Sequence, residues 1–335
     1  MHETRTISIE VCLDPTDWSD HLADETRRGL AARPPSIPPV WFYDEHGSHL
    51  FDRITRVAEY YPTRAERSIL TARADEIAAI TGADTLIELG SGTSEKTWLL
   101  IDALRSAGTL RRIAPFDVSE EMLWSSCRTM AERLPGIDVA AVVGDFHRHL
   151  GNIPAGGTRL MAFLGSTIGN LDPDERRRFL GEVWAALRPA GSTTGRGDWF
   201  LLGTDLIKSR DRLEAAYDDT DGITAQFNLN CLRVMNRELG ADFDLDAFHH
   251  EAHWNEERSL MEMRLVADSA QLVSIEGLDN ATVRLDAGEW IRTEISTKFT
   301  REGITAELQA AGLEVHEQWT DPEGDFLLTL ARPEV

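Results

Sequence analysis

The pattern of hydrophobic and polar positions is most regular between residues 85 and 207. Short apolar runs there alternate with helix-length segments, which is typical of a parallel sheet covered by helices on both faces. The apolar runs predict strands near residues 85–89, 112–117, 139–143, 159–164 and 199–204. A helix is expected at 172–187. Asp172, Pro173 and Glu175 can supply its cap, its first-turn proline and its capping-box partner.

On both sides of this region the pattern changes. A helix is expected at 16–32, then a stiff proline-rich linker at 34–39, an aromatic-rich segment, and a further helix from Pro62 to Ile80. Beyond the regular region, the expected elements are helices at 210–218 and 222–238, strand-like runs near 252–266, 271–276, 281–286 and 288–296, a helix near 300–311, and closing strands at 313–319 and 325–331. The last two strands predict a hairpin.

These elements predict an α/β protein with a doubly wound sheet and a C-terminal β-hairpin, interrupted by a second, α+β lobe. The core is expected at 71–207 and 299–335. The N-terminal segment 1–70 and the insertion 208–298 are expected to build the second lobe.

Composition limits the range of partners. The chain of 335 residues has 57 acidic and 34 basic side chains and a formal charge of −23. Such a surface repels phosphate backbones, so we expect no nucleic-acid partner and no binding to anionic membranes. Three scattered cysteines, with no signal peptide and no apolar stretch long enough to cross a bilayer, predict a soluble cytoplasmic protein with reduced thiols.

The segment after the first predicted strand is the most informative motif. Gly90 and Gly92, with Ser91 between them, form a tight loop where a doubly wound sheet binds nucleotide-like ligands. Glu95 stands where a dinucleotide fingerprint has its third glycine, and its carboxylate would repel a pyrophosphate. This argues against an NAD-linked oxidoreductase and favours an adenosine without phosphates, such as S-adenosylmethionine.

Three carboxylates end predicted strands in register with this loop. Asp117 can accept both ribose hydroxyls, and Asp145 can accept from an adenine amino group while Phe146 packs on the ring. Glu88 faces either a charged ligand tail or the helix end. Each carboxylate alone is as consistent with a cap or turn, but the three together favour ligand binding.

The loop from Gly165 to Asn170 follows the fourth predicted strand. An asparagine there can donate to a carboxylate and accept from an amine, which suits an amino-acid acceptor, but it is also typical of a left-handed loop position. The histidines at 147, 149, 249, 250 and 253 have no convincing metal spacing. We interpret them as surface residues and expect no metal.

With these residues collected, the chain resembles the S-adenosylmethionine-dependent histidine Nα-methyltransferases of ergothioneine biosynthesis. The resemblance runs from about Trp41 to the C-terminus. It rests on the segments 42–51, 59–64, 88–96, 163–170, 227–230 and 292–296. It implies a class I methyltransferase core, with a Rossmann-like sheet, and a substrate lobe. It also implies that free L-histidine is methylated three times on its α-amine to give hercynine, the first step of ergothioneine biosynthesis, with S-adenosyl-L-homocysteine as the other product.

The resemblance also implies roles for single residues. The residues expected at the methyl donor are Glu88, Gly90, Ser91, Gly92, Lys96, Asp117, Asp145 and Phe146. The residues expected at the substrate are Tyr60, Phe51, Gly165, Asn170, Tyr217, Met263, Glu294 and Ser296. Asn170 and Tyr43 are expected to act in catalysis, and Glu294 and Ser296 to hold the imidazole ring. On strand spacing alone, those last two would be outward-facing residues.

One alternative within the same class stays open: an S-adenosylmethionine-dependent N-methyltransferase of another amino acid or small amine. A carboxylate and a hydroxyl at 294 and 296 favour histidine, since each ring nitrogen then has a partner. We expect a monomer. The loop 192–197 is longer than is usual in the family.

Overall fold

The computed structural model describes residues 7–91, 96–188 and 197–334. The chain divides into two compact units. Unit 1 comprises residues 1–14, 64–206 and 299–335, and unit 2 comprises residues 15–63 and 207–298.

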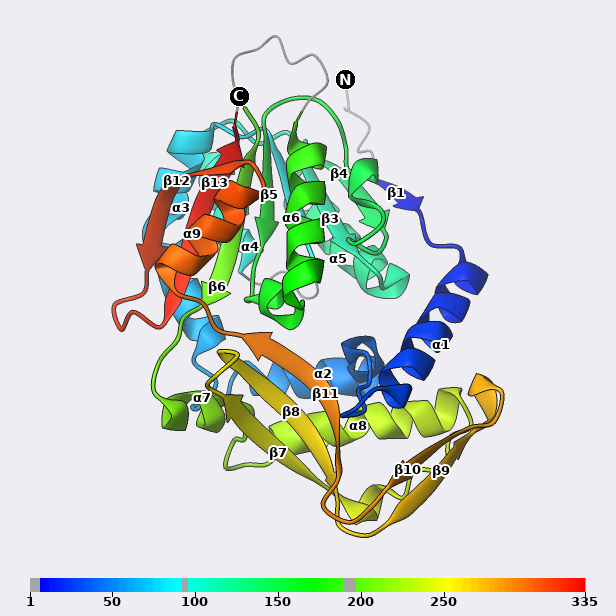
Figure 1. The fold of residues 1–335 in the computed structure, drawn as a ribbon. Coiled ribbons are helices and arrows are strands. Elements are labelled where there is room, and N and C mark those ends of the chain that lie inside the picture. Colours follow the sequence, from blue (N-terminus) through cyan, green and yellow to red (C-terminus); the bar gives the residue numbers. More distant parts are fainter. Residues whose placement is uncertain (1–6, 92–95, 189–196, 335) are drawn as a thin grey trace. The chain divides into compact units, whose positions relative to one another are not determined.

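Unit 1 is built on one mixed sheet with the strand order β1-β4-β3-β2-β5-β6-β13-β12 (Figure 1). Its strands are β1 (Ile7–Val11), β2 (Thr85–Leu89), β3 (Arg112–Asp117), β4 (Asp138–Val143), β5 (Arg159–Phe163), β6 (Trp199–Asp205), β12 (Leu313–Thr320) and β13 (Phe326–Pro333). The strands from β1 to β6 in this order pair in parallel, whereas β13 pairs antiparallel with both β6 and β12. This is a doubly wound sheet with a C-terminal hairpin, so the predicted α/β fold class is confirmed.

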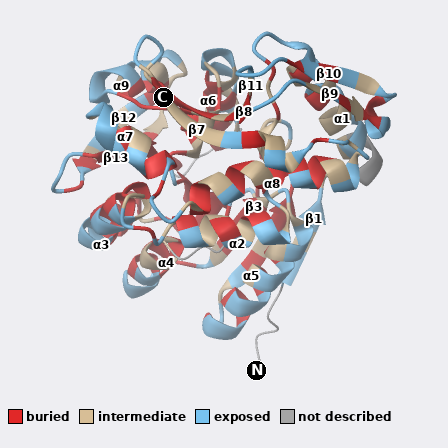
Figure 2. Cartoon of the chain, turned by 90° about the horizontal axis from the view of Figure 1, so that it is seen from below, coloured by how far each residue is buried: buried red, intermediate tan, exposed pale blue. Residues whose placement is uncertain are grey.

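Helices cover both faces of this sheet. One face packs against α3 (Pro62–Thr81), α4 (Thr97–Ser106) and α5 (Glu120–Arg133), and the other against α6 (Pro173–Leu187) and α9 (Arg301–Ala310). Figure 2 shows the first three helices exposed along one side and buried along the other, as amphipathic helices on a sheet must be. The capping box predicted for α6 is present, because the Asp172 side chain accepts from the Glu175 backbone N–H and Glu175 accepts from that of Asp172.

Unit 2 is an α+β assembly around the helix α8 (Ile223–Glu238). This helix packs against η1 (Pro39–Phe42), α2 (Glu45–Ile54), β7 (Phe248–Asn255) and β8 (Leu260–Ala267). The unit also contains α1 (Pro15–Ala31), α7 (Arg210–Tyr217), β9 (Gln271–Ile275), β10 (Ala281–Leu285) and β11 (Trp290–Thr297). The strands form an antiparallel sheet in the order β11-β8-β7 and a separate β9–β10 pair.

The structure corrects two expectations about the chain's organisation. Strand β1 was not predicted, because its side chains are mostly exposed and give no apolar run. It pairs with β4, so residues 7–14 belong to unit 1 and not to the second lobe, and 64–70 also lie in unit 1, on α3. The strand-like run predicted at 252–266 is a hairpin of β7 and β8.

Two further points concern the described residues. Of the predicted loop 192–197, only Gly197 lies among them. Across 7–91, 96–188 and 197–334, we find no helix that is long and apolar enough to cross a membrane.

Candidate active site

The glycine loop of unit 1 follows the fully buried strand β2. The N–H of Gly90 donates to the carbonyl of Phe116 on β3 at 2.8 Å, and Gly90 has φ +67°. This positive φ favours glycine. Among the residues that the structure describes, no atom lies within 4 Å of a Cβ built at Gly90. Glu88 is buried and accepts a hydrogen bond from Thr97, the first residue of α4. Gly92 lies outside the described residues.

The predicted donor-site residues of the next two strands lie at the same edge of the sheet. Asp117 ends β3 and accepts from the backbone N–H of Ser119 at 3.0 Å. Asp145 follows β4 and accepts from the N–H of His147 at 2.9 Å. The ring of Phe146 packs with its centroid 5.4 Å from that of Phe163. Since β2, β3 and β4 are parallel neighbours, the structure brings the three carboxylates to one edge.

The loop after β5 lies beside β2, at the point where the strand order reverses. Gly165 has φ +75° and Ser166 has φ 58°, and the short helix η3 (Thr167–Asn170) ends at Asn170, which is partly buried. The Ser166 hydroxyl accepts from the N–H of Asp205 on β6 at 2.9 Å. The loop that carries Asn170 is therefore tied to a core strand.

Sequence reasoning missed one residue of this region, Glu66. It lies on α3, is fully buried, and accepts the N–H of Gly165 with its two oxygens at 2.9 and 3.0 Å. It also forms an ion pair with Lys96. A lone glutamate on a helix gives no functional signal in a sequence, although Glu66 follows closely on the family-like segment 59–64.

In unit 2 a β-bulge decides which way Glu294 and Ser296 point. Arg292 is opposite Arg264 but Glu294 is opposite Met263, so Thr293 is an extra residue in β11. A bulge of this kind reverses the alternation of side chains beyond it. Glu294 consequently shares a face with the buried Met263.

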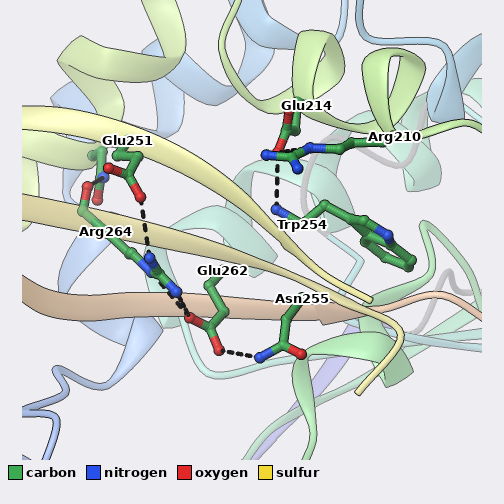
Figure 3. A network of polar contacts seen from close by, with 8 residues as sticks. Arg210, Glu214, Glu251, Trp254, Asn255, Glu262 and Arg264 are labelled. Carbon is green, nitrogen blue, oxygen red and sulfur yellow. Dashed lines mark hydrogen bonds and ion pairs between the residues drawn. The ribbon is translucent and has the colours of Figure 1, made fainter. Parts of the chain in front are cut away.

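The opposite face of the sheet β11-β8-β7 is polar. The guanidinium of Arg264 binds Glu262 at 2.6 Å and Glu251 at 3.1 Å, and lies 4.0 Å from the ring centroid of Trp290. Figure 3 shows this network, in which Asn255 also contacts Glu262. Without the bulge, Glu294 would point to this polar face.

Ser296 belongs to a buried group of three polar side chains. The hydroxyl of Tyr217 donates to Ser296 Oγ at 2.8 Å, and the ammonium of Lys298 donates to both oxygens at 2.7 Å. Lys298 is only 2% exposed. Burial raises the pKa of Glu294 to about 7, and the charge of Lys298 acts in the opposite direction. Sequence reasoning missed Lys298, which has no signal of its own next to a strand end.

Aromatic rings continue from Tyr217 to the other predicted substrate residues. Ring centroids are 6.4 Å apart between Tyr217 and Tyr60, 6.4 Å between Tyr60 and Phe51, and 5.9 Å between Phe51 and Tyr43. Phe227 on α8 packs against Phe51 and Tyr43 and was not predicted as a site residue. The structure therefore places all four predicted aromatic residues of unit 2 in one series, with Tyr43 at its exposed end.

One expectation about the histidines is wrong. His250 is buried, with its Nδ1 2.8 Å from the amide nitrogen of Asn228 and its Nε2 2.8 Å from the carbonyl of Tyr217. Because the Asn228 amide N–H can only donate, Nδ1 accepts from it and Nε2 carries the proton donated to the Tyr217 carbonyl. Burial lowers the pKa of His250. In the part of the chain that the structure describes, no group of three or more His, Cys, Asp or Glu residues is arranged to hold a metal ion.

The chain is similar to known proteins over most of its length. A family model described as "Histidine-specific methyltransferase, SAM-dependent" matches residues 22–333. The histidine N-alpha-methyltransferase of Mycolicibacterium smegmatis is 52% identical over 326 residues, which cover 97% of this chain and 99% of that protein. The enzyme of the same name from Mycobacterium tuberculosis is 54% identical over 313 residues, covering 93% of this chain and 95% of that one.

A more distant relative is named for a different amino acid. The L-tryptophan methyltransferase trpM of Psilocybe serbica is 28% identical over 365 aligned positions, with 99% of this chain and 98% of that protein covered. The family model and the two relatives at 52% and 54% identity match nearly the full length of the chain. This chain therefore belongs to the family of S-adenosylmethionine-dependent, histidine-specific methyltransferases.

Proposed function

We propose that this protein transfers three methyl groups from S-adenosylmethionine to the α-amine of L-histidine, giving hercynine in the first step of ergothioneine biosynthesis. The observation that carries the proposal is the pair Glu294 and Ser296, which the bulge at Thr293 turns toward Met263 and Tyr217. An imidazole ring has two nitrogens, and a carboxylate and a hydroxyl offer one partner to each. The names of the two relatives at 52% and 54% identity support the same substrate.

The residues of unit 1 fit the methyl donor. Asp117 would accept the ribose hydroxyls, and Asp145 and Phe146 would hold the adenine. Gly90, which has no side chain, allows a ligand to approach the backbone closely. S-adenosylmethionine supplies a methyl group bound to a positively charged sulfur. When the methyl group is transferred, the neutral thioether S-adenosylhomocysteine is the leaving group. We infer that no metal is needed, because a sulfonium leaving group needs no Lewis acid.

The protein's task is then to present the amine. In each transfer the nitrogen lone pair forms the new N–C bond while the C–S bond breaks, so the amine must have lost its proton beforehand. An in-line displacement depends mainly on orientation, and a near-attack geometry can supply a large part of the rate enhancement. We infer that Asn170 and Tyr60 orient the amino-acid backbone, with Tyr43 and Phe51 lining the site. Hydroxyl and amide groups can keep orienting the amine as its N–H donors are replaced by methyls.

The test is to incubate the purified protein with S-adenosylmethionine and L-histidine and to follow the product by mass. Successive gains of one, two and three methyl groups are expected. Accumulated intermediates would show that the product is released between transfers. Binding of the donor without any methylation of histidine would contradict the proposal.

The alternative is an N-methyltransferase of another amino acid, and the relative named for L-tryptophan is the reason to test it. The same assay with L-tryptophan and other amino acids decides between the two. A site that hydrogen-bonds a substrate group rejects analogues lacking it, often by ~10⁴ or more. We therefore expect Glu294→Ala to lower the ratio of kcat/KM for histidine to kcat/KM for the other amino acids. An unchanged ratio would show that Glu294 does not recognise the ring.

A further inference from the structure

Lys298 is a buried cation directly after β11. Its backbone N–H already donates to Ser259 at 2.8 Å, while its side chain turns to the hydroxyls of Tyr217 and Ser296. The ammonium also lies 4.7 Å from the centroid of the Tyr217 ring. Burying an ammonium is costly unless it is paired and hydrogen-bonded, so its position calls for a physical reason.

Counting donors and acceptors supplies that reason. An ammonium only donates, so the oxygens of Tyr217 and Ser296 both accept from Lys298. Ser296 accepts a second hydrogen bond from the Tyr217 hydroxyl. A serine hydroxyl has two acceptor positions and one proton. With both acceptor positions used, Ser296 is left to act as a donor to a ligand.

Glu294, two residues earlier on the same strand face, has the opposite character. An ionised carboxylate only accepts. A ligand ring that meets Ser296 and the ionised form of Glu294 must therefore offer an N–H to Glu294 and an unprotonated nitrogen to Ser296. Neutral imidazole is such a ring, and indole, which has an N–H only, is not.

We propose that Lys298 is a positioning residue for substrate specificity, which fixes the Ser296 hydroxyl as a hydrogen-bond donor to the unprotonated ring nitrogen of the substrate. This inference rests on the proposed function, since the ring concerned is the imidazole of L-histidine. The charge of Lys298 also acts against the rise that burial causes in the Glu294 pKa.

The test is a double-mutant cycle on kcat/KM for L-histidine with Lys298→Met, Ser296→Ala and the double variant. Lys298→Met should lower kcat/KM about tenfold or more, the size expected when a hydrogen bond to a charged group is lost. In the Ser296→Ala background the same change should have a much smaller effect, because Lys298 acts through Ser296. Should Lys298→Met not fold, Lys298→Gln takes its place; it removes the ammonium and adds a carbonyl acceptor, and the same difference between the two backgrounds is expected.

Lys208→Met is the matched control. Lys208 also donates to a tyrosine hydroxyl, that of Tyr61 at 2.7 Å, and lies 4.3 Å from the centroid of its ring. Its loss should leave kcat/KM for histidine close to the wild-type value. Losses at Lys298 that are equal in both backgrounds, or matched by Lys208→Met, overturn the inference while the function stands. A wild-type protein inactive on histidine overturns both.

Discussion

Glu294 lies directly opposite Met263 in the β11–β8 pair, and the extra residue Thr293 is the reason. The bulge has its own anchor, since Thr293 is buried and its hydroxyl donates to Asn228 at 2.6 Å and to the carbonyl of Met263 at 3.1 Å. A bulge next to a binding site commonly re-aims a side chain. Here it brings a carboxylate onto the face that carries Met263, and burying that carboxylate has a cost in stability.

That cost should depend on pH. The pKa of Glu294 is raised from 4.5 to about 7 in the folded protein, so the folded state holds a proton that the unfolded chain releases. The stabilising contribution of this group is complete below about 4.5 and is lost as the pH rises through about 7. Glu294→Gln stays neutral throughout. The free energy of unfolding of the wild type should therefore fall between pH 5 and pH 8, whereas this group causes no such fall in the variant. The difference between variant and wild type should move in favour of the variant by up to about 3 kcal/mol over this range.

Urea unfolding of both proteins at the two pH values measures this difference. The same variant should lose activity on histidine, because the amide cannot replace a carboxylate as an acceptor of full charge. A stability difference that is the same at pH 5 and pH 8 would show that Glu294 does not titrate in this range.

The fold could be predicted from the sequence where local signals were sufficient. The capping box of α6 and the apolar runs of β2 to β6 each depend on neighbouring residues only, and all were located within a few positions. Strand β1 could not be found this way, because its backbone pairs with β4 while its side chains stay mostly exposed.

The site was harder to predict, because burial of a charge depends on distant partners. Glu66 accepts the N–H of Gly165, 99 residues further along the chain, and neither residue type signals that contact. Strict alternation predicts that Glu294 and Ser296 point outward, and only the bulge at Thr293 reverses this. Their place in the site came from the family resemblance alone.

The ion pair between Glu66 and Lys96 gives a second prediction, on stability. Glu66 is fully buried, whereas the Lys96 side chain is 20% exposed. Lys96→Met leaves a buried carboxylate without its cation and should destabilise the protein by about 3 kcal/mol, in the range for broken buried pairs. Glu66→Gln should cost less, because the amide oxygen still accepts from Gly165 and water can reach Lys96.

Urea unfolding of the two single variants and the double variant tests this asymmetry. The double variant should be more stable than the sum of the single losses predicts, because neither charge is then left alone. Strictly additive losses would show that the two side chains do not interact in solution.

Asn170 gives a prediction on activity. If Asn170 orients the acceptor amine, Asn170→Ala should lower kcat/KM for histidine by about 100-fold, the cost of a poorly positioned reactant. Stability should change little, because Asn170 is only partly buried. The matched control is Asn152→Ala, since Asn152 also ends a short 3-10 helix, η2 (Leu150–Asn152), and its side chain donates to the exposed Glu10. Steady-state kinetics close to wild type in Asn170→Ala would exclude the proposed role.

Two helical glycines allow a final prediction about the packing that supports the aromatic series. A Cβ at Gly47 in α2 would lie 1.6 Å from the carbonyl oxygen of Phe42 and 2.9 Å from the Asn230 side chain. Gly47→Ala must therefore push η1 away from α2, and we expect a loss of about 3 kcal/mol or more. Gly181 in α6 is the control, because a Cβ there meets no atom of the described residues within 4 Å.

Gly181→Ala should instead stabilise the protein by about 0.5 to 1 kcal/mol, since alanine loses less backbone entropy on entering a helix. Thermal and urea unfolding measure both changes. Because Phe42 precedes Tyr43 and stacks on Phe227 with centroids 4.5 Å apart, Gly47→Ala should also weaken histidine binding, an effect absent from Gly181→Ala. If Gly47→Ala were as stable and as active as the wild type, the close contact between α2 and η1 would not be needed to position these rings.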